Sequence, residues 1–175
     1  MTDTEWFRIK KDPDAPIANV AGLVKKFPYF TDAEAFAKAD DVVVHYEQET
    51  FLACDILFEP TFLINDRLQP LFKLLEPAIA YKGVQIYRKF KPEAAPRPLY
   101  WLPYLPFTDA ISSDSQIVRG KATKLVVKRE SLREKRVAHC RLPADDIWLL
   151  SLEAAECFLR REPLGVVLEK IFSQP

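Results

Sequence analysis

The chain has 175 residues, of which 49% are hydrophobic and 12% aromatic, and this composition excludes an intrinsically disordered protein. Its 25 Lys and Arg balance its 25 Asp and Glu, which argues against a globally basic nucleic-acid-binding protein. The chain has 14 Pro and only 4 Gly, and so few glycines argue against a loop that cradles nucleotide phosphates.

The first predicted elements are short. Residues 6–9 are apolar and predict a strand or a docked arm. An Ala-rich stretch at 33–39 predicts a helix capped by Thr31 or Asp32, since both residue types accept a hydrogen bond from the first helical turn. Residues 42–46 are mostly β-branched, which predicts a buried strand.

A second helix is predicted after a short extended run at residues 53–58. Asn65 can cap this helix, which we expect over residues 66–75. Pro70 requires that the helix start later or bend, because a proline beyond the first turn removes a backbone hydrogen bond. The apolar stripe of the helix consists of Leu68, Leu71, Phe72 and Leu75.

The second half of the chain predicts several strands and one more helix. Residues 91–98 form a Pro-rich loop, and Gly83 marks a bulge or turn at the start of a strand. Ser151 caps a helix over residues 152–161, which Pro163 ends. The extended runs are residues 80–90, 98–107, 123–128, 137–141, 147–150 and 165–172.

Many short strands with two or three helices, and no regular alternation of strand and helix, predict an α+β fold with a mixed or antiparallel sheet. No linker divides the chain, so we expect one globular domain over residues 1–175. Within it, residues 1–41 form an N-terminal arm and a short helix, and residues 42–175 form the α+β core. The odd, widely spaced cysteines and the absence of a signal peptide or a long apolar run predict a cytoplasmic protein without a membrane partner.

The chain contains no known catalytic or phosphate-binding signature, so we expect no catalytic residues, no cofactor and no metal site. His139 and Cys140 are adjacent, and on a strand their side chains point to opposite faces. His45 and Cys54 lie on neighbouring predicted strands and could meet in space. The alternative hypothesis is therefore a small-molecule-binding domain or minor enzyme with a pocket near these two residues.

The charges are unevenly distributed along the chain. Residues 32–59 hold eight acids and one base, whereas residues 119–136 hold eight bases and two acids. These segments form either two solvated faces or a charged docking surface for a protein partner. We do not expect nucleic acid on the basic run, because aromatic residues are not interleaved with it. The candidate basic binding residues are Lys121, Lys124, Lys128, Arg129, Arg133 and Arg136.

Residues 98–107 form the most distinctive segment, with three prolines that forbid a helix and a high density of aromatic rings. The segment is either a layer that covers the core or an aromatic binding strip, because aromatic residues dominate both cores and interface hot spots. The candidate anchors are Tyr100, Trp101 and Tyr104.

The order of these features resembles a known family. Residues 54–65 read CDILFEPTFLIN and lead into the predicted amphipathic helix, after which come Leu-Glu-Pro and the extended run YKGVQIY at residues 81–87. This order, over about residues 42–172, is similar to bacterial polymorphic-toxin immunity proteins, the immunity family numbered eleven. The chain differs in having Asn65 where Ser is usual and Pro70 inside the helix. The resemblance implies a non-enzymatic protein that binds a cognate toxin and blocks it.

Overall fold

The computed structural model of the chain describes residues 5–15, 30, 32–40, 42–46, 54–59, 61–88 and 99–174. Thr31 and the Pro-rich loop expected at residues 91–98 lie outside this range. The class is α+β, as predicted, with more strand than helix. In chain order the elements are β1 (Trp6–Lys11), α1 (Ala33–Lys38), β2 (Val42–Tyr46), β3 (Ile56–Leu57), β4 (Leu63–Asn65), α2 (Gln69–Leu75), β5 (Ala80–Arg88), β6 (Leu99–Tyr104), β7 (Gln116–Val118), β8 (Lys121–Lys124), β9 (Val126–Lys128), α3 (Arg129–Leu132), β10 (Val137–Leu142), β11 (Asp145–Ser151), α4 (Leu152–Leu159) and β12 (Val166–Gln174).

One five-stranded sheet, here called the terminal sheet, joins the two ends of the described chain. Its strand order is β10-β11-β1-β12-β9, and every pairing is antiparallel except that of β12 with β9. The first strand is thus the middle strand of the sheet, between β11 and β12. The prediction of an arm separate from the core is corrected here, because Trp6 and Ile9 are buried in this sheet.

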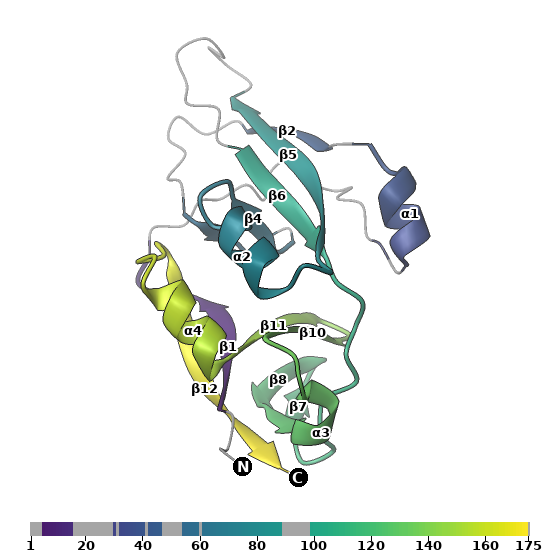
Figure 1. The fold of residues 1–175 in the computed structure, drawn as a ribbon, viewed down its shortest axis with the longest axis vertical. Helices are drawn as coiled ribbons and strands as arrows, with labels where there is room; N and C mark the ends of the chain where they lie inside the picture. Colours follow the sequence, from purple (N-terminus) through teal and green to yellow (C-terminus); the bar gives the residue numbers. More distant parts are fainter. Residues whose placement is uncertain are drawn as a thin grey trace.

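A second five-stranded sheet, here called the central sheet, has the order β2-β5-β6-β4-β3. It lies above the terminal sheet in Figure 1, with α2 between the two and α1 at one side. The pairing of β2 with β5 is parallel and the others are antiparallel, so the sheet is mixed. Gly83 pairs with Trp101 in an unbroken register, so it is a regular strand position and not a bulge.

The helices begin where the caps predict, with one exception. The Asp32 side chain accepts a hydrogen bond from the first turn of α1, at 2.7 Å, and Ser151 caps α4 in the same way, at 3.4 Å. Helix α2 begins at Gln69, later than the predicted 66, which places Pro70 in its first turn, where a proline loses little. The four-residue α3 was not expected and raises the number of described helices to four.

A shared hydrophobic core holds the two sheets together. Phe72 of α2 and Phe158 of α4 meet edge to face at 6.1 Å, and both are fully buried. Trp148 of the terminal sheet stacks on Phe62, which precedes β4, at 4.9 Å. Burying an aromatic side chain of this size contributes roughly 2–3 kcal/mol, so these contacts stabilise the junction. The apolar stripe of α2 faces this core as predicted, since Leu68, Leu71, Phe72 and Leu75 are all buried.

Candidate functional site

Tyr100, the first predicted aromatic anchor, lies inside the central sheet. Its side chain is 0% exposed, and its hydroxyl donates a hydrogen bond to the backbone carbonyl of Cys54 at 2.6 Å. Burial raises the pKa of Tyr100, because the low-dielectric interior disfavours the phenolate. Tyr100 therefore presents no surface that a docking partner could contact.

The other two predicted anchors are half-buried. The indole N–H of Trp101 donates to the carboxylate of Asp66 at 2.9 Å. Tyr104 stacks on Phe36 of α1, with ring centroids 5.1 Å apart and planes inclined by 23°. Most of the aromatic strip thus covers the core, which is the first of the two alternatives considered for it, and Phe107 at its end is 41% exposed.

The predicted basic run divides between elements. Lys121 and Lys124 lie on β8 and Arg133 follows α3, all three exposed. The other three predicted residues have polar or acidic neighbours. These pairs are Lys128 with Asp109 at 3.2 Å, Arg129 with Ser173 at 3.1 Å, and Arg136 with Glu153 at 3.4 Å.

The β7–β8 hairpin exposes apolar and basic side chains together. Ile117 and Val118 on β7 are 46% and 56% exposed. Phe172 of β12 is 63% exposed, and the Lys124 ammonium lies 5.0 Å from its ring centroid. We call Ile117, Val118, Arg119, Lys121, Lys124 and Phe172 the hairpin surface.

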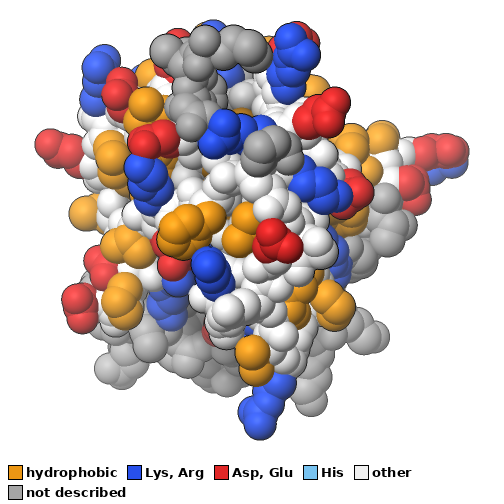
Figure 2. Space-filling view, turned by 90° about the horizontal axis from the view of Figure 1, so that it is seen from below, with side chains coloured by type: hydrophobic (Ala, Val, Ile, Leu, Met, Phe, Trp, Pro, Cys, Tyr) orange, Lys and Arg blue, Asp and Glu red, His pale blue; other side chains and the backbone are white. Residues whose placement is uncertain are grey.

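At this end of the molecule, apolar side chains lie in small groups among Lys and Arg, with Asp and Glu interspersed (Figure 2). The sequence reasoning named Lys121 and Lys124 as candidate binding residues and counted Arg119 only in the basic segment. It missed the three apolar members, Ile117, Val118 and Phe172. Gly120 is the sequence feature that could have indicated the hairpin. In the structure, Arg119 and Gly120 have φ angles of 52° and 79°. Two successive residues at positive φ form the tight turn that joins antiparallel strands, and a glycine in a two-residue loop indicates it.

The acidic segment at residues 32–59 has one acid, Asp55, that is buried inside the fold. Asp55 is buried at 4% exposure and accepts hydrogen bonds from four donors. The backbone N–H of Leu164 donates at 2.7 Å, Arg67 donates through Nε at 3.2 Å and through a second nitrogen, and the Asn65 amide donates the fourth. Arg67 also donates to the carbonyl of Arg161 at 2.6 Å. We call this network the Asp55 node, and it joins β4 to the turn before β12.

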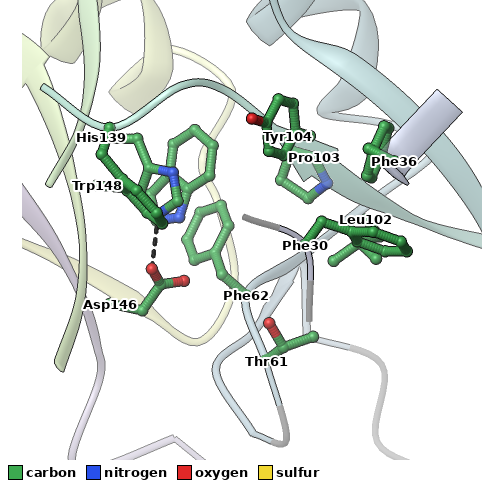
Figure 3. Close-up of a pocket in the computed structure, with 11 residues that line it drawn as sticks. Phe30, Phe36, Thr61, Phe62, Leu102, Pro103, Tyr104, His139, Asp146 and Trp148 are labelled. Carbon is green, nitrogen blue, oxygen red and sulfur yellow. Dashed lines mark hydrogen bonds and ion pairs between the residues drawn. The ribbon is translucent and has the colours of Figure 1, made fainter. Parts of the chain in front are cut away.

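A histidine and an aspartate meet at the junction of the two sheets (Figure 3). His139 of β10 lies with Nδ1 3.0 Å from the carbonyl of Leu105 and with Nε2 2.6 Å from the carboxylate of Asp146. Each ring nitrogen of His139 therefore already has an oxygen partner within the fold. His139 cannot take a proton from a substrate without releasing one of these partners.

The pocket beside this pair is small. It has a volume of about 40 Å³ and is lined mainly by aromatic rings, together with Thr61 and Asp146. The ring of His139 stacks on Trp148 at 4.2 Å, and the Trp148 indole N–H has no hydrogen-bond partner among the described residues. Small-molecule sites measure roughly 300–1,000 Å³, so this pocket has room for water rather than for a substrate.

Cys140 lies on the opposite face of β10 from His139, as the alternation of strand side chains predicts. Burial raises the pKa of the Cys140 thiol to about 11, so it remains protonated at neutral pH. The adjacent histidine and cysteine are therefore structural residues in two different packing layers.

The pocket hypothesised near His45 and Cys54 rested on neighbouring strands, and these strands are not neighbours. β2, which contains His45, is the first strand in the order of the central sheet, and β3, which follows Cys54, is the last. Four strand spacings of about 4.8 Å separate the two strands by roughly 19 Å. A general base must lie within hydrogen-bond reach of its nucleophile, so this order removes the basis for such a pair.

Within the part of the chain that the structure describes, no three His, Cys, Asp or Glu side chains gather as a metal site would require. The same part of the chain contains no helix with the length and apolar character needed to span a membrane. No protein-family model matches the chain, and a search of curated proteins finds no match.

Proposed function

We propose that this chain is a cytoplasmic, non-enzymatic protein-binding module whose partner is a bacterial toxin that it neutralises. The observation that carries the proposal is the hairpin surface, where exposed apolar side chains stand beside bases with no ion-pair partner among the described residues. Apolar groups release water on contact, and unpaired charges orient an approaching partner, so the combination suits protein association.

Two further observations support a binding role. Both ring nitrogens of His139 are occupied, and the pocket beside it is far smaller than a substrate site. The resemblance of residues 42–172 to immunity proteins supports the toxin as the partner. The hairpin surface replaces the aromatic strip as the expected contact region, because Tyr100 is fully buried.

The test is to purify the native protein under gentle conditions and identify what remains bound. We expect one protein in a fixed ratio to the chain. Expression of that protein alone should stop growth, and co-expression with this chain should restore it. A partner that is harmless when expressed alone would leave a binding module without an immunity role. If no protein binds and a small molecule raises the melting temperature instead, the proposal is wrong.

A further inference from the structure

The β7–β8 hairpin has one anchored edge and one open edge. On the β8 side, the backbone N–H of Ala122 donates to the carboxylate of Asp145 at 3.1 Å. The same carboxylate pairs with Arg8 at 2.6 Å, with both side chains only 12% exposed. At the turn, the N–H of Ala144 donates to the carbonyl of Gly120 at 3.1 Å. These contacts fix β8 against the terminal sheet.

β7 pairs with β8 alone among the described strands, and all three of its residues are exposed. The outer edge of a strand presents N–H and C=O groups that an extended peptide can pair with. A two-stranded sheet is only marginally stable, and a third strand stabilises it. Among the described residues no strand occupies the outer edge of β7, so an added strand can pair there.

The charge around this edge determines which strand it accepts. Residues 115–129 contain five bases and no acid. Arg119, Lys121 and Lys124 have no ion pair among the described residues, and the Lys124 ammonium lies over the ring of Phe172. An acidic segment would be attracted to this edge, whereas a basic one would be repelled.

We propose that the partner contributes an extended acidic segment that pairs as a third strand with the outer edge of β7. Its backbone bonds to β7, its apolar side chains cover Ile117 on one face of the hairpin, and its carboxylates approach Lys121 and Lys124 on the opposite face. This inference rests on the proposed protein-binding function, and it adds the chemistry of the partner and the way it docks.

The direct test uses two synthetic peptides of equal length, one alternating Val with Glu and the other alternating Val with Lys. Each is titrated into the full, ¹⁵N-labelled chain and followed by NMR. We expect the Glu peptide to shift the amide signals of residues 116–118 and to slow their hydrogen exchange. We expect no such change with the Lys peptide. Raising the salt from about 0.05 M to about 0.5 M should weaken binding about tenfold, because salt screens exposed charges.

Charge-reversal variants keep the test independent of folding. Lys121→Glu with Lys124→Glu should weaken binding of the Glu peptide at least about tenfold, by losing two attractions and gaining two repulsions. The matched control reverses two exposed bases elsewhere, Lys73→Glu on α2 and Arg160→Glu after α4, and should change binding less than about twofold.

Three results would overturn the strand proposal. The first is equal binding of both peptides, and the second is amide shifts confined to residues outside the hairpin. The third is tighter binding of a single-stranded DNA oligonucleotide or of phosphatidylserine vesicles, which would make the surface a phosphate-binding one. If the co-purified native partner still binds the Lys121→Glu, Lys124→Glu chain at full strength, the strand proposal fails while the protein-binding function stands.

Discussion

The Asp55 node and the hairpin surface both carry charged residues, in opposite settings. Asp55 is 4% exposed and accepts four hydrogen bonds, so its charge is fully used within the fold. Lys121 is exposed and has no ion pair among the described residues. A formal charge therefore stabilises the fold in the first region and remains available to a partner in the second.

This difference shows what a charge count along the sequence can miss. Asp55 belongs to the segment with the largest acidic excess, and the fold removes it from the surface. The basic segment is divided as well, since Lys128 and Arg136 lie beside acids while Lys121 and Lys124 do not. A docking surface is thus defined by the charges that remain after the fold has used the others.

The largest expected effect is the loss of Asp55. Asp55→Ala leaves the Leu164 N–H and the Asn65 amide without their acceptor, and charge-assisted hydrogen bonds contribute roughly 1.5–3 kcal/mol each. We expect urea denaturation to show a loss of about 3 kcal/mol or more. The control is Glu34→Ala, which removes an exposed ion pair with Lys38 and should cost less than about 0.5 kcal/mol. Equal losses of stability in Asp55→Ala and Glu34→Ala would mean that the buried Asp55 node contributes no more than an exposed ion pair.

A glycine beside each region gives the next largest effect. Gly165 has φ of 78°, and an added Cβ would lie 2.7 Å from the Cys54 sulfur. Gly120 has φ of 79°, but its nearest contact would be 3.1 Å away, at Ala144. Positive φ costs roughly 1–2 kcal/mol in both, so Gly165→Ala should destabilise the chain by about 1 kcal/mol more than Gly120→Ala in thermal unfolding.

Removing the Cys54 sulfur should separate the two causes. In the Cys54→Ala background, Gly165→Ala should cost about as much as Gly120→Ala, because each change then combines a positive φ with a nearest contact of 3.0 Å or 3.1 Å. A cost that stays unchanged in this background would mean that the sulfur contact does not contribute.

Alkaline pH should destabilise the fold through two tyrosines of the central sheet, Tyr81 and Tyr100. Burial raises the pKa of Tyr81 and Tyr100 above the usual value of 10.0. A raised pKa in the folded state means that the tyrosine contribution to stability is constant below pH 10.0 and falls above it, where the unfolded chain loses the phenolic protons first. The buried Cys140 thiol adds a loss that begins near its ordinary pKa of 9.0. The fall can reach about 1.4 kcal/mol per pH unit for each tyrosine.

The check is the free energy of unfolding measured from pH 8 to pH 11. Tyr100→Phe should start about 1 kcal/mol lower, because it loses the hydrogen bond to the Cys54 carbonyl, and should then fall less steeply. An identical slope in this variant would show that Tyr100 does not contribute to the alkaline loss.

The smallest expected effect on stability belongs to the hairpin surface. Lys121→Glu with Lys124→Glu changes two exposed residues and should alter the free energy of unfolding by less than about 0.5 kcal/mol. Urea denaturation checks this. A loss comparable to that of Asp55→Ala would mean that these lysines stabilise the fold rather than a complex.

Local patterns predicted many of the elements. Asp32 and Ser151 cap their helices as expected, and the stripe from Leu68 to Leu75 is buried. These features depend on residues close in sequence, whose preferences act over one or two turns. Helix α2 starts at Gln69, which places Pro70 in the first turn, where a proline is tolerated.

Pairings between distant strands could not be predicted from the sequence. The neighbourhood of β2 and β3 was inferred from their order in the chain, yet β5, β6 and β4 lie between them. The burial of Tyr100 depends in the same way on both neighbours of β6. The hairpin surface was found only in part, because Ile117 of β7 and Phe172 of β12 are far apart in the sequence and only the fold shows that both are exposed.

The position of β1 has a consequence for the time at which the molecule can fold. Glu5 pairs with Lys170, 165 residues further along the chain, and both neighbours of β1 come from the C-terminal part. During synthesis on the ribosome, β1 therefore cannot pair with β11 and β12 until almost the entire chain has been made. The central sheet, whose strands span residues 42–104, can assemble earlier. Pairings of such long range are closed slowly, so the terminal sheet should form last, with the central sheet as its template.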